Sequence, residues 1–159
     1  MTRLSLEHFK LLTARSPSLE LGTGGTPEIT FQEVSDVLAS VSDSCRIYAR
    51  WHYAMDRDYR QTMSEILMVK VLSDPQAREI AYVWPMWYWY VELALLMHQK
   101  LTDLTKKQKA IEVNKRWWRK GDDRKLRIVQ LALDEWDYEI RRAIADWNYR
   151  LSVAQADAL

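Results

Sequence analysis

Apolar residues recur along this chain at intervals of three and four, and over no useful length do they alternate with polar residues. This spacing is typical of amphipathic helices rather than strands. Thr30-Phe31-Gln32-Glu33 matches the capping box that opens a helix, with a threonine cap and a glutamate three residues later. Helical spacing then continues through Val34, Val37, Leu38 and Val41.

Further helices are predicted from start signals and spacing. One begins near Ser42-Asp43, and the next spans about Asp58 to Leu72. Ser73-Asp74-Pro75 predicts a new start, with Asp74 as cap and Pro75 at the first helical position. Because Pro85 removes a backbone hydrogen bond and clashes with the preceding turn, either one kinked helix or two helices occupy residues 75–101.

The last helix is predicted to be long. Val129 to Leu151 is expected in one helix, capped by Asp122 or Asp123, with Trp136 and Trp147 as anchors. Such a heptad-like seam packs either on the domain or on a second copy, which would make a homodimer through the C-terminal helix. Its members are Val129, Leu133, Trp136, Ile140, Ala143, Trp147 and Leu151.

The domain organisation is predicted from the glycine and proline residues, which interrupt helices. Gly22, Gly24 and Gly25 mark a loop together with two nearby prolines. We expect an N-terminal arm and loop over residues 1–28, with a short amphipathic helix near its start, and one helical domain over residues 29–159. The fold class is all-α, a single helical domain of about six or seven helices.

The segment from Ile80 to Met97 is almost wholly apolar, but it contains Pro85 and Glu92 and carries its aromatic residues in the middle. A membrane span would place aromatics at its two ends and would exclude the charge. We therefore predict a buried helix and no membrane association. Glu92 would be paired there with an arginine or a tyrosine hydroxyl.

Composition indicates a globular protein with few chemical sites. The chain is 48% hydrophobic and 28% charged, with eight Trp and eight Tyr. Its one cysteine, Cys45, excludes an internal disulfide and a cysteine-rich zinc module, and it suits the cytoplasm. No phosphate loop or nucleophile elbow occurs, and His52 with Asp56 is a poor catalytic pair. We predict no enzyme activity, cofactor or metal.

Positive charge is concentrated between Lys100 and Arg127. This segment holds eleven Lys/Arg and four Asp/Glu, a local charge of +7 in a chain of net charge +1. Such a footprint is expected of a nucleic-acid contact, although a solvated cationic helix is the plainer alternative. Trp117 and Trp118 lie about 100° apart on a helix, so only one can face the core, and the sequence leaves open which.

Leu104 to Arg127 can be read as a helix-turn-helix, in which the second helix enters the DNA major groove. Glu112 departs from this motif, because the turn prefers glycine there. The candidates for contact with bases are Asn114, Lys115, Arg116 and Arg119. The candidates for contact with phosphates are Lys106, Lys107, Lys109 and Lys120. An anionic ligand also suits Arg124, Lys125 and Arg127, which oppose the dipole of the final helix.

Six stretches carry a likeness to known proteins: residues 29–38, Tyr53-Ala-Met-Asp-Arg57, Val91-Glu-Leu-Ala-Leu95, Val113-Asn-Lys-Arg-Trp-Trp-Arg119, Leu133-Asp-Glu-Trp136 and Trp147-Asn-Tyr-Arg-Leu151. Over roughly residues 29–151 the chain resembles small phage late-gene antiterminators of the Q type.

The resemblance implies a transcription regulator in the cytoplasm of a bacterial host. Such proteins bind a DNA element near the phage late promoter, engage a paused RNA polymerase and travel with it past terminators. Asn114, Lys115, Arg116 and Arg119 match the DNA-reading helix. The zinc-binding cysteine cluster of some branches cannot form with Cys45 alone.

A different class of function remains open. The surplus of Trp and Tyr, and the lack of enzyme chemistry, also fit a small inhibitor of the anti-defence type that binds and blocks a host protein or nucleoprotein complex. A virion component or helical scaffold is a third interpretation, based only on the last helix. Under the first two we expect a protein-directed surface outside the basic segment.

Overall fold

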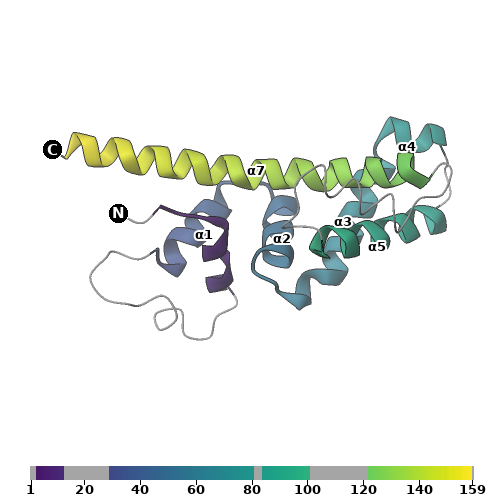
Figure 1. The fold of residues 1–159 in the computed structure, drawn as a ribbon, viewed down its shortest axis with the longest axis horizontal. Helices are drawn as coiled ribbons and strands as arrows, with labels where there is room; N and C mark the ends of the chain where they lie inside the picture. The colour runs from purple at the N-terminus through teal and green to yellow at the C-terminus, as the bar shows by residue number, and fades with distance from the viewer. Residues whose placement is uncertain (1–2, 13–28, 81–83, 101–121, 159) are drawn as a thin grey trace. The chain divides into compact units, whose positions relative to one another are not determined.

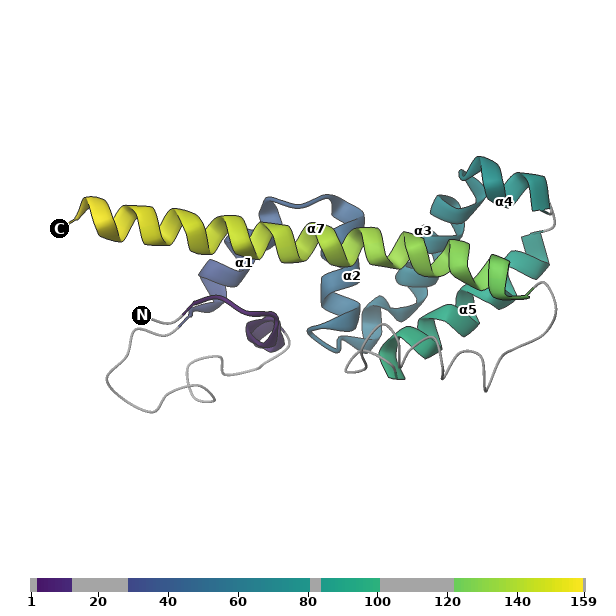
Figure 2. The same cartoon turned by 45° about the horizontal axis from the view of Figure 1, so that its top comes forward.

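The computed structural model describes residues 3–12, 29–80, 84–100 and 122–158, and every regular element within these ranges is helical (Figures 1 and 2). The predicted all-α class and the long C-terminal helix are therefore confirmed. The elements are η1 (Leu6–Leu12), α1 (Phe31–Ala39), α2 (Asp43–His52), η2 (Arg57–Tyr59), α3 (Arg60–Leu72), α4 (Pro75–Ile80), α5 (Trp84–Lys100) and α7 (Asp122–Asp157).

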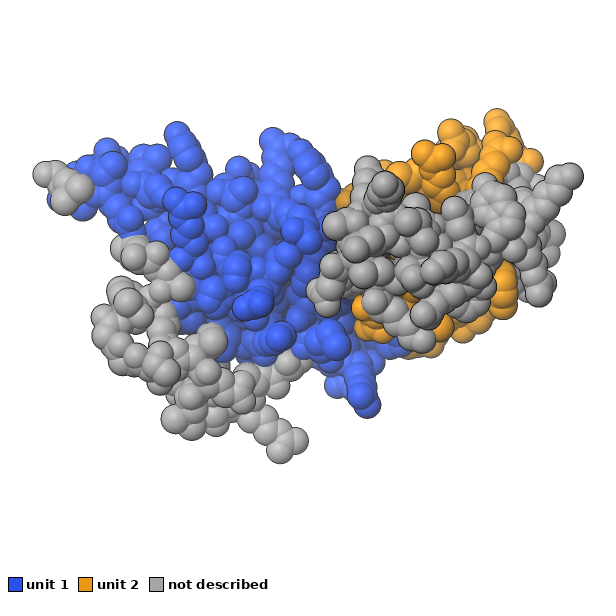
Figure 3. Space-filling model, viewed as in Figure 1, with its two compact units in different colours: residues 1–60, 136–159 blue, residues 61–135 orange. Residues whose placement is uncertain are grey.

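The chain divides into two compact units, whereas the sequence predicts one helical domain over residues 29–159 (Figure 3). Unit 1 comprises residues 1–60 and 136–159, and unit 2 comprises residues 61–135. Helix α7 contributes to both, because its residues 122–135 belong to unit 2 and the remainder to unit 1.

The helix starts follow the predicted local chemistry. At α1, Thr30 Oγ1 accepts from the Glu33 N–H at 3.3 Å, and Glu33 Oε2 accepts from the Thr30 N–H at 2.7 Å. Ser42 caps α2, and Pro75 is the first residue of α4. Pro85 is the second residue of α5, where its missing N–H costs nothing. Of the two alternatives for residues 75–101, the described parts, 75–80 and 84–100, form two helices, α4 and α5.

Unit 1 buries the N-terminal segment. Leu4, Phe9 and Leu11 are all buried, and Phe9 is fully enclosed. The Leu4 backbone also forms two hydrogen bonds with the Asn148 amide, each 2.9 Å long. Residues 3–12 are thus packed on the unit instead of forming part of an arm, because an apolar 3₁₀ helix removes more surface from water when docked. Fully buried with them are Val34, Cys45, Tyr48, Ala49 and Ile140.

Unit 2 is built from α3, α4, α5 and the first part of α7. Its fully buried core includes Met63, Leu67, Trp87, Val91 and Leu95. Polar contacts join its helices in pairs: Ser64 Oγ donates to Glu92 Oε1 at 2.6 Å, and Lys70 Nζ lies 2.5 Å from Glu135 Oε2. Ser64 is thus one partner of Glu92, for which the sequence predicts an arginine or a tyrosine hydroxyl. None of the described helices combines the length and apolarity needed to cross a membrane.

The predicted seam of α7 is only partly buried. Val129 and Leu133 in unit 2, and Trp136 and Ile140 in unit 1, are buried. The later seam positions Ala143, Trp147 and Leu151 are half-buried. Trp136 is thus confirmed as a core anchor, whereas Trp147 keeps contact with solvent. The reason is local: fewer described elements of unit 1 pack against the last turns of α7.

Candidate functional site

Most of the predicted nucleic-acid contacts lie outside the described residues. This holds for Lys106, Lys107, Lys109, Asn114, Lys115, Arg116, Arg119 and Lys120, and with them for the helix-turn-helix and the choice between Trp117 and Trp118. Three members of the predicted site are described: Arg124, Lys125 and Arg127.

These three cations occupy the first turns of α7, in unit 2. Arg124 and Arg127 are exposed and lie three residues apart, so their side chains share one side of the helix. Lys125 is half-buried, and its Nζ lies 5.2 Å from the centroid of the Tyr90 ring. That distance is within the range of a cation–π contact, which fixes the ammonium group beside α5.

Helix α5 supplies an exposed indole next to this contact. The Trp89 ring meets the Tyr90 ring edge-on, with centroids 5.0 Å apart and an interplanar angle of 82°. Tyr90 is buried, but Trp89 is 52% exposed. One buried tyrosine ring therefore positions both a cation and an exposed aromatic side chain. We call Trp89, Arg124, Lys125 and Arg127 the basic–aromatic corner.

Trp89 is a candidate that the sequence alone does not reveal. Apolar residues cover every side of the 80–97 segment, so no polar stripe marks which side faces solvent. The general prediction of a buried helix holds for Trp87, Val91 and Leu95, whereas Trp89 and Leu96 emerge at 52% and 43% exposure. Trp89 and Leu96 are seven residues apart and so lie on one side of the helix, but this spacing does not tell whether that side is exposed.

A second cluster, in unit 1, joins α2 to one turn of α7. At the start of α2, the Ser42 N–H donates to Glu139 Oε2 at 2.8 Å, and Ser42 Oγ donates to Glu139 Oε1 at 2.9 Å. Ser42 Oγ also accepts from the Cys45 N–H. Glu139 thus takes the part that the fourth residue of a capping box plays, but it comes from another helix. Its negative charge also suits the positive end of the α2 dipole.

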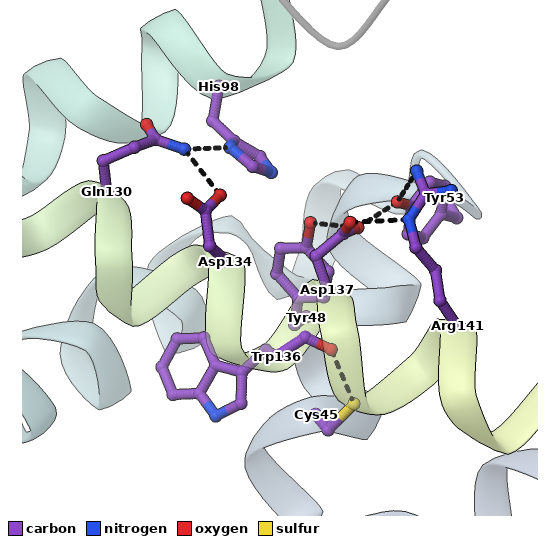
Figure 4. Close-up of polar contacts among 9 residues, drawn as sticks. All are labelled: Cys45, Tyr48, Tyr53, His98, Gln130, Asp134, Trp136, Asp137 and Arg141. Atoms are coloured by element: carbon purple, nitrogen blue, oxygen red, sulfur yellow. Dashed lines mark hydrogen bonds and ion pairs between the residues drawn. The ribbon is translucent and has the colours of Figure 1, made fainter. Parts of the chain in front are cut away.

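At the other end of α2, Asp137 collects three donors (Figure 4). Tyr48 Oη donates to Asp137 Oδ1 at 2.9 Å, and Tyr53 Oη forms a short hydrogen bond to the same oxygen. Arg141 Nε donates to Asp137 Oδ2 at 2.7 Å. We call Ser42, Tyr48, Tyr53, Asp137, Glu139 and Arg141 the α2–α7 clamp.

The pKa values within this clamp follow from burial and charge. Burial by itself raises the pKa of Asp137. Other contacts outweigh burial and lower the pKa below its ordinary value of 3.8: the hydrogen bonds from Tyr53 and Arg141, the positive charge of Arg141, and the hydrogen bond from Tyr48. Burial and the nearby Asp137 carboxylate raise the pKa of Tyr48 and of Tyr53. At neutral pH Asp137 is therefore a carboxylate, and Tyr48 and Tyr53 are neutral phenols.

Cys45 lies within the same contact. Its side chain is fully buried, and Sγ donates to the Trp136 carbonyl at 3.3 Å. Burial, together with Glu139, raises the pKa of the thiol to about 12. A nucleophilic cysteine needs a lowered pKa, so this environment suits packing rather than catalysis. His52, also buried, stacks on Tyr48 with ring centroids 5.4 Å apart.

In unit 2, the His98 ring contacts α7 (Figure 4). Gln130 Nε2 lies 3.0 Å from His98 Nδ1 and donates to Asp134 Oδ1 at 3.1 Å. An amide N–H can only donate, so this contact suits a His98 ring whose Nδ1 accepts. His98 lies in the last turn of α5, where it is buried against α7. Within the described residues no group of His, Cys, Asp or Glu is arranged to hold a metal ion.

Comparisons with known proteins found no matching family model, curated protein or solved structure.

Proposed function

We propose that this protein is a DNA-binding transcription regulator of the phage antiterminator type, acting in the cytoplasm of a bacterial host. The observation that supports it is the basic–aromatic corner, where Tyr90 contacts both Lys125 and the exposed Trp89, and where Arg124 and Arg127 are exposed on the same turns of α7 as Lys125. Phosphate contacts by such arginines supply affinity without regard to sequence. The predicted base-reading residues Asn114, Lys115, Arg116 and Arg119 would supply the specificity.

The proposed partner besides DNA is RNA polymerase, which the resemblance implies. Side-chain exposure in unit 1 supports a protein-directed surface: Tyr138 and Tyr149 are 67% and 71% exposed. Tyrosine is enriched at protein interfaces because it offers a large apolar area with a polar end. These residues lie outside the basic segment, so both partners could bind at once.

Fluorescence anisotropy on a labelled duplex tests the DNA contact. We compare the wild type with an Arg124→Gln/Arg127→Gln variant over a series of salt concentrations. The matched control is Arg3→Gln/Arg57→Gln, which removes two exposed cations from unit 1. If both corner arginines bind phosphates, the slope of log K against log[salt] becomes shallower by roughly 1.8, and the control leaves it unchanged. Equal slopes for the two variants would refute a contact at the corner.

A second arm of this experiment tests the base-reading residues. Lys115→Ala/Arg116→Ala/Arg119→Ala should reduce the preference for a specific site over a scrambled duplex, because each lost bidentate contact costs about 1–3 kcal/mol. A triple variant that binds like the wild type would favour the alternative function below.

The alternative is a small inhibitor that binds and blocks a host protein or nucleoprotein complex. It is favoured by exposed apolar side chains away from the basic segment, with Phe31 at 43%, Met55 at 64% and Val69 at 68%. A pull-down from nuclease-treated bacterial lysate separates the two functions. Recovery of polymerase subunits supports the regulator, and recovery of another defined complex supports the inhibitor. Recovery of neither argues against both.

A further inference from the structure

The C-terminal part of α7 carries a second stripe that the core does not use. Its six members are exposed and are spaced four, three, four, three and four residues apart: Tyr138, Arg142, Ala145, Tyr149, Ser152 and Ala156. At 100° per residue they stay within about 40° of one line along the helix. We call these residues the outer stripe.

The outer stripe faces away from unit 1. The buried residues Trp136, Ile140 and Ile144 lie roughly 160–240° around the helix from it, so the core and the stripe occupy opposite sides. In Figures 1 and 2 the C-terminal turns of α7 extend past η1 and α1, and no other described helix of unit 1 lies beside them. Two large side chains of the outer stripe, Tyr138 and Tyr149, are 67% and 71% exposed.

The outer stripe is complementary to the outer stripe of a second copy that runs in the opposite direction. Suppose that two copies of α7 pair antiparallel, with the two-fold axis at the height of Trp147 along the helix. Tyr138 then falls opposite Ala156 of the second copy, and Ala145 falls opposite Tyr149. Each tyrosine then meets an alanine, which is the alternation of large and small side chains that interlocking helices need. A two-fold axis makes each contact occur twice, as in most homodimers.

The charges near the stripe permit this register. Arg142 falls opposite Ser152, so the two Arg142 side chains start about 15 Å apart along the axis, beyond the screening length at ordinary salt. The nearest like charges are the two Asp146 carboxylates beside the stripe. Each has Arg142 and Arg150 four residues away on its own helix, which offset this repulsion.

We infer that the outer stripe is a homodimer surface, at which α7 of a second copy of this chain packs antiparallel about Trp147. The seam predicted from the sequence is not this surface, because Val129, Leu133, Trp136 and Ile140 are used by the core. The paired length is short, since residues 138–156 span about 27 Å. An interface of this size lies at the lower end of specific contacts, so we expect a dissociation constant of roughly 10–100 μM.

Sedimentation equilibrium of the full chain, from about 1 μM to several hundred μM, measures the pairing. Tyr138→Ala/Tyr149→Ala should raise the dissociation constant at least tenfold. The control is Leu131→Ala, an equally apolar change on α7 at a position 53% exposed but before the stripe. Circular dichroism verifies that the variants remain folded. A wild type that stays monomeric throughout, or a dimer that the tyrosine variant leaves intact, overturns the inference.

Disulfide trapping tests the register independently. An Arg142→Cys/Ser152→Cys variant should form covalent dimers under mild oxidation, because each new cysteine faces its counterpart in the second copy. Each single variant should not, since identical cysteines would lie about 15 Å apart along the axis, and a disulfide needs Cα atoms within about 7 Å. Buried Cys45 is present in all three variants and serves as an internal control. Efficient trapping of the single variants would refute the antiparallel pairing.

One outcome would show that the outer stripe binds a different protein. If the wild type is monomeric and the tyrosine variant loses a protein that the wild type captures from lysate, the surface binds that protein and not a second copy. Neither experiment involves nucleic acid, so the dimer and the DNA contact fail separately. The outer stripe includes Tyr138 and Tyr149, so a second copy and polymerase would compete for these two side chains.

Discussion

Replacing Asp137 by asparagine tests whether the α2–α7 clamp stabilises unit 1. In the native protein Asp137 Oδ1 accepts from Tyr48 and Tyr53, and Oδ2 accepts from Arg141. Asparagine keeps an oxygen for the two phenols but turns both hydrogen bonds from charge-assisted into neutral ones. Its NH₂ group would then meet another donor, the Arg141 Nε–H.

The expected cost can be built from these parts. A hydrogen bond to a charged group contributes about 1.5–3 kcal/mol and a neutral one about 0.5–1.5, so the two phenols lose roughly 2 kcal/mol together. The Arg141 side chain is 57% exposed, so solvent screens its ion pair, and we assign it no more than about 0.5 kcal/mol. Asp137→Asn should therefore lower the free energy of unfolding by about 2–3 kcal/mol at pH 7.

The effect should depend on pH in a defined direction. The folded pKa of Asp137 lies below that of the unfolded chain, so its carboxylate contributes fully above the unfolded value of about 3.9. That contribution is lost as pH falls through the folded pKa. The difference between wild type and Asp137→Asn should thus be constant from pH 5 to 7 and should shrink below about pH 4.

Urea unfolding, followed by tryptophan fluorescence and by circular dichroism, measures both quantities. The matched control is Asp58→Asn, the same change at an exposed position of unit 1, which should shift stability by no more than about 0.5 kcal/mol. Tyr53→Phe, and its combination with Asp137→Asn, complete a double-mutant cycle. An Asp137→Asn variant as stable as the control, or a difference that persists unchanged at pH 3, would refute the reasoning.

Three further predictions concern single side chains. Trp136→Ala should cost about 3–5 kcal/mol, because the side chain is buried; a urea midpoint equal to that of the wild type would contradict this. Cys45 should resist alkylation by iodoacetamide at pH 8 and react rapidly in urea, since its thiol is buried with a pKa of about 12; fast labelling of the folded protein would contradict this. Met55 is 64% exposed and has a φ of 58°, where glycine avoids the steric cost of a side chain. Met55→Gly should therefore raise the free energy of unfolding by between zero and about 1 kcal/mol. Met55→Val should lower the melting temperature, and a variant as stable as the wild type would contradict this.

Local signals in the sequence were enough to locate the starts of α1 and α4. Thr30 and Glu33 satisfy each other across three residues, and Pro75 begins a helix because its own geometry favours that position. Such contacts depend on neighbours in the chain, so the sequence contains all of the information. The same holds for the α7 seam, whose spacing predicts one buried side for Val129 and Leu133.

Contacts between distant residues were not predictable in this way. Ser42 was identified as a helix start, but its partner Glu139 lies 97 residues away on an element whose register against α2 no local pattern fixes. Leu4 is held by Asn148 across 144 residues, which is why the N-terminal segment resembled an arm in the sequence. Trp89 was hidden for a different reason, since a helix that is apolar on all sides gives no sign of which side is exposed.

The outer stripe and the basic segment, if both act as proposed, must be thermodynamically linked. A two-fold axis at Trp147 gives a dimer with two basic segments, and DNA with two inverted half-sites could then bind both. Such DNA stabilises the dimer by the same factor by which the dimer strengthens DNA binding. Tyr138→Ala/Tyr149→Ala should therefore weaken binding to a two-half-site duplex and leave binding to a single half-site unchanged, although neither tyrosine belongs to the basic segment. Equal weakening on both duplexes would show that the tyrosines act on the DNA contact itself, and no weakening on either would show that the chain binds DNA as a monomer.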